Sequence, residues 1–380
     1  MNRTKTYITT VILIVLFVFT AKYHHGKITY PKTRKVDVVD TYHGVSVNDP
    51  YRWLEDDQSS QTNCWVRAQN RITNKFLKKI PYRDKIKARL TELNDYEKFS
   101  IPFQQGDKFY FYKNDGLQNQ WVLYTQDNLD ANPKVLLDPN TFSDDGTVAL
   151  RGTYFSNDSR YLGYGVSSSG SDWKEFYILD LSTNQLLDDH IQWIKFSGMA
   201  WTETGFFYST FPKPKEGEEL SGTNENSKVY YHELGTDQTT DILIYEDTEH
   251  PRHSPYVSTT EDNQFLILYQ SKGTHGNTIS IKDLNNPDSP FISVVSDFDG
   301  DHGIVHNVGN TFYMMTDRNA PKKRLVSFSL NNPEMKNWFD VLPESEHTLQ
   351  SVSFPRDKLI AIYMVDAQDK AFVHKKNGQF

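Results

Sequence analysis

The sequence predicts an all-β fold, a β-propeller of about six blades that follows a short helical segment. Three observations lead to this prediction. Short aromatic strands alternate with turns rich in Gly, Ser, Asn and Asp. The pattern recurs with a period of about 45 residues, which is typical of four-stranded propeller blades. A stretch with helical periodicity precedes the first repeat.

The clearest repeat runs from Gly152 to Gln185. Its apolar runs are short and end at residues that release a strand and turn the chain. The expected strands and turns, in order, are Tyr154–Phe155, Ser156–Ser159, Arg160–Val166, Glu175–Asp180 and Ser182–Asn184. A unit of this kind buries little surface alone, so it needs neighbours with which it shares a core.

Looser copies of this repeat are found on both sides of it. They cover Lys108–Leu137, Met199–Glu233, Val257–Leu284, Val305–Leu330 and Val352–Val373. Two other architectures remain open, a β-sandwich and several unrelated β-domains. The period favours the propeller.

Composition limits the classes of function. The chain has 380 residues and a net charge of −8, enough length for a large β-domain with appended segments. The acidic balance argues against a nucleic-acid partner, for which a basic face is expected. The single cysteine, Cys64, excludes an internal disulfide and a cysteine-based zinc site.

Residues 1–25 are expected to form an export signal or a signal anchor. Arg3 and Lys5 precede an unbroken apolar run, Val11–Phe19, which is too short for a comfortable membrane span. A buried core helix is the alternative. The protein is therefore expected to be exported (periplasmic or secreted) or anchored by an uncleaved signal, with membrane contact only through residues 8–21.

Residues 26–94 are expected to be a helical lead-in, and residues 95–380 the propeller. Two amphipathic helices are predicted, Gln58–Ile80 and Tyr82–Leu93, separated by Pro81. The apolar stripe of the first helix is expected to serve simple packing. Its members are Trp65, Ile72, Phe76 and Leu77.

Six segments of the chain carry a family resemblance. They are Val39–Val45, Asp49–Asp56, Trp65–Asn70, Ser169–Trp173, Lys195–Trp201 and Tyr230–Gln238. In this order they resemble the prolyl oligopeptidases, and the resemblance covers the chain from about Tyr30 to its end. It implies a two-domain serine peptidase that cleaves short peptides after proline.

In that family an α/β-hydrolase domain carries a Ser/Asp/His triad, and a seven-bladed propeller restricts access to it. The opening helices pack on the hydrolase domain, which continues after the propeller. The resemblance therefore implies a seven-bladed-type propeller, truncated at Phe380 to about six blades, without the catalytic domain.

The sequence itself offers no catalytic residues. A G-x-S-x-G nucleophile elbow needs two glycines four positions apart, and no pair among the 20 glycines has this spacing. The serine-rich stretch Ser167–Ser171 lies between two expected strands of a blade and is interpreted as a loop.

No metal site or cofactor is predicted either. His250 and His253 are three residues apart, but Pro251 breaks the helix that would align them, and no third ligand is evident nearby. The acidic run Asp297–Gly303 lacks the glycine and the glutamate that a calcium loop requires, so it is interpreted as structural.

The resemblance implies two site residues. Phe196 matches a phenylalanine that lines a pocket near the specificity site of the family, although it could instead be an ordinary core aromatic. Asp172 matches a loop that faces the other domain, so an interdomain ion pair is expected. Gln270–Lys272 replace an expected arginine, and a methionine expected near His253 is not present.

These observations lead to one main hypothesis and two alternatives. In the main hypothesis the chain is the propeller part of a serine peptidase, inactive alone, whose partners are short proline-containing peptides once a catalytic domain is supplied. The first alternative is a non-catalytic propeller that binds peptides or a protein partner. The second is one half of a split peptidase that docks on a separate hydrolase domain.

Overall fold

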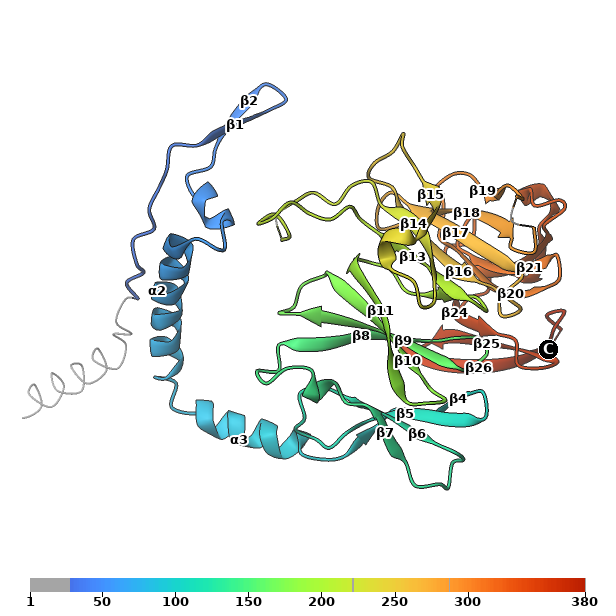
Figure 1. Cartoon of the computed structure of the whole chain (residues 1–380), viewed down its shortest axis with the longest axis horizontal. Coiled ribbons are helices and arrows are strands. Elements are labelled where there is room, and N and C mark those ends of the chain that lie inside the picture. Colours follow the sequence, from blue (N-terminus) through green and yellow to red (C-terminus); the bar gives the residue numbers. More distant parts are fainter. Residues whose placement is uncertain (1–27, 221, 287, 380) are drawn as a thin grey trace, which may run out of the picture. The chain divides into compact units, whose positions relative to one another are not determined.

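The computed structural model describes residues 28–220, 222–286 and 288–379, and the expected export segment lies outside them. The chain divides into two compact units, one that ends at Leu93 and one that begins at Asn94 (Figure 1). In the described part of the chain, no helix is both long and apolar enough to cross a membrane.

The first unit holds a hairpin and the helices. The elements are β1 (Val39–Tyr42), β2 (Val45–Asn48), η1 (Arg52–Glu55), α2 (Ser60–Leu77) and α3 (Arg83–Asn94). Ser59 caps α2, because its hydroxyl accepts a hydrogen bond from the Thr62 N–H at 3.1 Å. The two expected helices are thus present, each with slightly different ends.

The apolar stripe of α2 is not buried by the first unit itself. Phe76 is 50% exposed and Leu77 is 36% exposed. Trp65 is partly covered, and its indole N–H donates to Thr33 Oγ1 at 2.9 Å. Among the described residues of this unit, no large apolar side chain is fully buried, so the expected packing needs another surface.

The second unit consists of antiparallel sheets that form six successive blades (Figure 1). Blade 1 comprises β3 (Lys98–Phe99), β4 (Phe103–Gln105), β5 (Lys108–Asn114), β6 (Val122–Gln126) and β7 (Lys134–Leu137). Blade 2 comprises β8 (Val148–Phe155), β9 (Tyr161–Ser168), β10 (Lys174–Asp180) and β11 (Gln185–Ile194). Blade 3 comprises β12 (Ala200–Trp201), β13 (Gly205–Thr210), β14 (Lys228–Glu233) and β15 (Ile242–Glu246).

The remaining blades repeat this order. Blade 4 comprises β16 (Ser254–Thr259), β17 (Phe265–Ser271), β18 (Asn277–Asp283) and β19 (Ile292–Val295). Blade 5 comprises β20 (His302–Val308), β21 (Thr311–Thr316), β22 (Arg324–Ser329) and β23 (Phe339–Leu342). Blade 6 comprises β24 (Thr348–Ser353), β25 (Lys358–Val365) and β26 (Gln368–Lys375). The blades confirm the predicted all-β propeller architecture.

Each of blades 2 to 5 is buried on both faces because the strand pleat sends alternate side chains to opposite neighbours. In β17, Phe265, Ile267 and Tyr269 pack against blade 5, whereas Leu266 and Leu268 pack against blade 3. Three further clusters join blades 1 and 2, blades 2 and 3, and blades 5 and 6. The core is therefore a series of layers between consecutive sheets.

Blade 2 differs from the expectation in two ways. Its first strand begins at Val148 rather than Tyr154, and β11 forms a fourth strand that was not expected. The early part of β8 was missed because Gly152 interrupts the apolar pattern. This glycine has a φ of 117° and lies where the pairing register shifts between Leu150 and Thr153.

Blades 2 and 3 are joined by hydrogen bonds as well as by a packed apolar core. Ile194 pairs with Thr210 across the two blades, which makes one eight-stranded sheet. The Gln192 N–H donates to Gln238 Oε1 at 3.0 Å, and Gln238 Nε2 donates back to the Gln192 carbonyl at 3.1 Å. These bonds join the end of β11 in blade 2 to η3 (Gln238–Thr240) in blade 3.

Candidate functional site

Phe196 lies in the turn between β11 and β12, and its side chain projects from a well-anchored backbone. The residue has a φ of 55° and is 69% exposed. The next residue, Ser197, is buried, and its hydroxyl accepts the Ser209 N–H at 2.8 Å. Lys174 Nζ donates to the Ser197 carbonyl at 2.6 Å. The exposure excludes the alternative that Phe196 is an ordinary core aromatic.

The loop that contains Asp172 lies beside this turn. Lys195 Nζ lies 4.9 Å from the centre of the Trp173 ring and 5.6 Å from that of Phe196. The indole N–H of Trp173 donates to the Glu219 carbonyl at 2.7 Å. Asp172 itself is exposed, and no described residue forms an ion pair with it. The structure thus brings the Asp172 loop and the Phe196 turn together.

A cavity of about 550 Å³ opens next to Trp173. Its apolar walls include Phe142, Tyr164, Trp173, Tyr177 and Trp193, and its charged groups include Lys174 and Glu175. Burial lowers the pKa of Lys174, and the charge of Arg151 lowers it further. An aromatic wall with a few charged groups can bind a small apolar group.

The serine-rich stretch provides no nucleophile. Ser167 belongs to β9, and its hydroxyl donates to the Ser171 carbonyl at 2.5 Å. This hydrogen bond closes the turn of residues 169–171 that leads to β10. The interpretation of the stretch as a loop is correct for these residues and wrong for Ser167 and Ser168, which end β9.

A buried group of three ionisable residues links blades 2 and 3. His232 on β14 lies between two carboxylates, with Nε2 at 2.9 Å from Asp189 Oδ1 and Nδ1 at 2.7 Å from Asp241 Oδ1. The three side chains are at most 2% exposed. Asp189 also accepts the Gly235 N–H at 2.7 Å, and Asp241 accepts the Tyr208 hydroxyl at 2.6 Å.

This environment keeps His232 charged. Burial opposes the charge, but the hydrogen bonds and charges of Asp189 and Asp241 outweigh it and raise the pKa of His232 to about 9. Every polar atom named in the group has a partner. The group therefore acts as an ionic lock between two blades, without a nucleophile that the histidine could activate.

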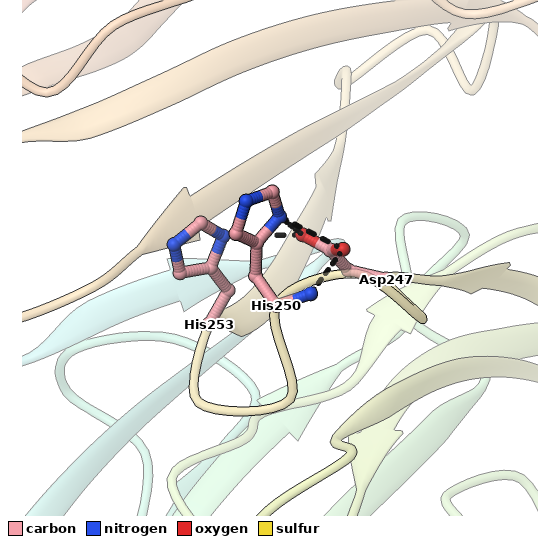
Figure 2. A group of neighbouring side chains, drawn as sticks. All are labelled: Asp247, His250 and His253. Atoms are coloured by element: carbon pink, nitrogen blue, oxygen red, sulfur yellow. Dashed lines mark hydrogen bonds and ion pairs between the residues drawn. The ribbon is translucent and has the colours of Figure 1, made fainter.

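A second group of His and Asp residues lies in the turn between β15 and β16 (Figure 2). His250 Nδ1 is 3.2 Å from Asp247 Oδ1, and His253 Nδ1 is 3.1 Å from Asp247 Oδ2. From the sequence, no third ligand is expected near the two histidines, whereas the structure places the Asp247 carboxylate beside both of them. Donor atoms of the three residues lie within 4.8 Å of one another, an arrangement that could hold a metal ion.

Gln270, one of the residues that replace the arginine of the family, contacts this group. Its Nε2 donates to Asp247 Oδ2 at 3.2 Å. Lys272, from the same replacement, lies with its Nζ 4.6 Å from the centre of the Phe298 ring. Gln270 and Lys272 thus each contact a neighbouring side chain of this loop region.

The acidic run that follows β19 is occupied by structural contacts. Arg318 pairs with Asp297, and Asp301 Oδ1 accepts the Gly276 N–H at 2.7 Å. Asp301 Oδ2 also lies 3.1 Å from His275 Nδ1, and Asp317 lies 3.9 Å from the same nitrogen. These three residues form another group that could hold a cation.

No local pattern indicates the buried lock, because Asp189, His232 and Asp241 come from separate segments of two blades. The Asp247 group did have a signal. Its residues follow a D-x-x-H-x-x-H spacing, and the side chains meet because a turn rather than a helix carries them.

Comparison with known proteins identifies relatives of this chain. It is 42% identical to a prolyl endopeptidase of Elizabethkingia meningoseptica over 351 residues, which are 92% of this chain and 49% of that protein. It is 31% identical to prolyl oligopeptidase A of Amanita bisporigera, with 92% of this chain and 51% of that protein covered. The chain thus spans about half the length of these curated relatives.

A solved structure of a related protein shows the same similarity. Prolyl oligopeptidase B of Galerina marginata, in a form bound to a 35mer hydrolysis and macrocyclization substrate, superposes with a TM-score of 0.81 at 30% identity. The match covers 92% of this chain and 53% of that protein. Residues 30–380 also match the family described as prolyl oligopeptidase, N-terminal beta-propeller domain. The chain therefore belongs to the prolyl oligopeptidase family, and its second unit is the propeller domain of that family.

Proposed function

We propose that this propeller admits short proline-containing peptides to a serine-hydrolase domain and supports their cleavage after proline. The observation that carries the proposal is the family match over residues 30–380. The related Galerina marginata enzyme was solved with a peptide substrate bound, so peptides are the substrate class of at least one close structural neighbour.

Phe196 is proposed as a substrate-lining residue. Its ring is exposed, while the bonds of Ser197 to Ser209 and Lys174 fix the backbone that carries it. A ring held in place before binding loses little conformational entropy when a peptide covers it. Its apolar face suits proline, which offers an apolar ring and no backbone N–H.

The first unit is proposed to dock on the hydrolase domain. Phe76 on α2 and Ile86 on α3 are 50% and 51% exposed, and Tyr82 between the helices is 59% exposed. Large apolar side chains at this density are typical of a surface that another domain covers. Asp172 is proposed to face the same domain and to pair with one of its cations.

A chimera tests the proposal. Residues 30–380 replace the matched half of the Elizabethkingia meningoseptica enzyme, so that its remaining half supplies the hydrolase. A chromogenic peptide with proline before the leaving group is the probe. We expect the chimera to hydrolyse it and the present chain alone to give no hydrolysis.

Two variants of the chimera separate binding from folding. We expect Phe196→Ala to raise KM about tenfold with little change in kcat, since an apolar contact of roughly 1.5 kcal/mol is lost. Phe339→Ala is the matched control, because Phe339 is 66% exposed but lies on β23 of blade 5. Equal KM values for the two variants would show that Phe196 does not contact the substrate.

The chimera also distinguishes the alternative of a non-catalytic propeller. A folded chimera without hydrolysis, together with saturable binding of a proline-containing peptide by the present chain alone, would favour a binding protein. Absence of both hydrolysis by the chimera and peptide binding by the chain would contradict the proposed function.

We further propose that the protein is exported or anchored by its N-terminal segment. The support is the basic start with Arg3 and Lys5 followed by the apolar run Val11–Phe19. Fractionation of the native host, with N-terminal sequencing of the recovered protein, tests this. Recovery from the cytosol with an intact N-terminus would contradict it.

A further inference from the structure

We propose that Asp247, His250 and His253 bind one divalent transition-metal ion of the zinc class. The proposal is independent of the proposed peptidase function. It rests on the chemistry of three donor side chains that one turn brings together, between β15 and β16 (Figure 2).

The donor atoms already converge. The Nδ1 atoms of both histidines lie 3.1 to 3.3 Å from oxygens of the Asp247 carboxylate. Ligands about 2.0 Å from a tetrahedral zinc ion are separated by about 3.3 Å. The two imidazole rings are stacked, with their centres 4.5 Å apart, so a cation that replaces the protons between these atoms requires the exposed His250 ring to turn toward it.

The surrounding residues hold the carboxylate in place. Gln270 Nε2 donates to Oδ2 from β17, and the N–H groups of Glu249 and His250 donate to Oδ1 at 3.1 and 3.0 Å. The His253 ring is backed by Phe298, with ring centres 5.1 Å apart. Outer contacts of this kind orient metal ligands and are part of most metal sites.

One side of the Asp247, His250 and His253 group is open to solvent. The side chains of Asp247 and His253 are 15% and 16% exposed, whereas that of His250 is 57% exposed. A metal ion can therefore enter from the His250 side, and a water molecule can occupy the remaining position, as in zinc sites with three protein ligands.

The ligand types determine the class of metal. Two imidazoles and one carboxylate suit zinc and its neighbours in the first transition row. Calcium and magnesium prefer sets made of oxygen ligands, which this group does not supply. The group of His275, Asp301 and Asp317 offers a single imidazole, so it serves as the comparison site.

The test is a titration with Co²⁺ by visible absorption, followed by competition with Zn²⁺. The protein is tag-free and carries Cys64→Ser, because Cys64 is an exposed thiol that could bind either metal. His24 and His25 are also replaced by alanine, since adjacent imidazoles could form a separate site. We expect one equivalent of metal and visible bands that Zn²⁺ abolishes.

Variants locate the ion. We expect His250→Ala and His253→Ala each to weaken binding by more than about tenfold, and Gln270→Ala, which leaves all three ligands, to weaken it less. His275→Ala and the half-exposed His347→Ala are the controls, and binding should stay within about twofold of the parent.

His250→Ala is the decisive variant, because its exposed side chain can be removed without unfolding the turn. We expect Zn²⁺ to raise the Tm of the parent protein and to leave that of His250→Ala unchanged. Unchanged metal affinity in His250→Ala and His253→Ala, or no saturable binding by the parent, would overturn the proposal.

Discussion

Asp189, His232 and Asp241 place one histidine between two carboxylates, whereas Asp247, His250 and His253 place one carboxylate between two histidines. The first group is fully buried and holds blades 2 and 3 together. The second lies in a turn, with His250 more than half exposed. The same two residue types therefore serve different purposes in blade 3 and just after it.

The difference follows from charge and solvent access. In the buried group, a protonated His232 balances part of the negative charge, and every donor and acceptor is satisfied within the protein. In the turn, a single carboxylate is shared by two imidazoles that water can reach. A buried, satisfied group stabilises the fold, while an open group with spare donor atoms can exchange ligands.

The largest expected loss of stability comes from the substitution His232→Leu. This change leaves Asp189 and Asp241 buried without their shared partner, and we expect a loss of about 4 kcal/mol in the free energy of unfolding. Urea denaturation followed by tryptophan fluorescence measures it, with His250→Leu as the control. A loss below about 1 kcal/mol would show that the buried group is not a lock.

The second prediction concerns pH. The pKa of His232 rises from its ordinary value of 6.5 to about 9 in the folded protein, so its charge stabilises the fold below pH 6.5. This contribution is lost as the pH rises through about 9, and we expect it to amount to about 3 kcal/mol.

Urea midpoints of the parent and of His232→Gln at pH 6 and pH 10 check the pH effect. Other groups titrate over the same range, so the informative quantity is the difference between the two proteins. The stability gap should be large at pH 6 and should shrink at pH 10. A gap that does not depend on pH would mean that His232 is not charged in the folded protein.

The third prediction concerns the outer contact of the lock. Tyr208→Phe removes the donor to Asp241 Oδ2, and we expect a loss of about 2 kcal/mol. Tyr177→Phe is the control, since its hydroxyl donates at 2.8 Å to Glu175, a carboxylate that is 45% exposed. The control should lose less than about 1 kcal/mol because water can replace that donor. Equal losses would contradict the role given to burial.

The smallest change in stability is expected for a substitution in the turn between β15 and β16. Without added metal, we expect His250→Ala to change the free energy of unfolding by no more than about 0.5 kcal/mol. Thermal and urea denaturation in the presence of a chelator measure this. A much larger loss would indicate that the turn, like the buried group, is part of the structural framework.

The sequence predicted the blades well because their signal is local and repeated. Strands such as β17 contain a continuous apolar run, here residues 265–269, before a polar turn, and a similar pattern returns in the other blades. The prediction from sequence failed where the local residue pattern does not match the strand that forms. In β8, Gly152 and the register shift beside it conceal a strand that begins at Val148.

The candidate sites were harder to predict for a physical reason. The exposure of Phe196 depends on the bonds that anchor Ser197 to Ser209 and Lys174, and these residues are distant in sequence. The buried lock depends on the pairing of two blades. The group in the turn with Asp247 is local, and the three-residue spacing of its members is visible in the sequence, but this spacing indicates a site only if a turn and not a helix brings the side chains together.

The junction of blades 2 and 3 has a consequence for amide hydrogen exchange. The Ile194–Thr210 pair, the reciprocal Gln192–Gln238 bonds and the His232 lock all cross the same boundary. Opening either blade therefore breaks backbone and ionic contacts in the other. The amides of these two blades should exchange as one cooperative unit, while blades 4 and 5, whose strands form separate sheets, should open more independently.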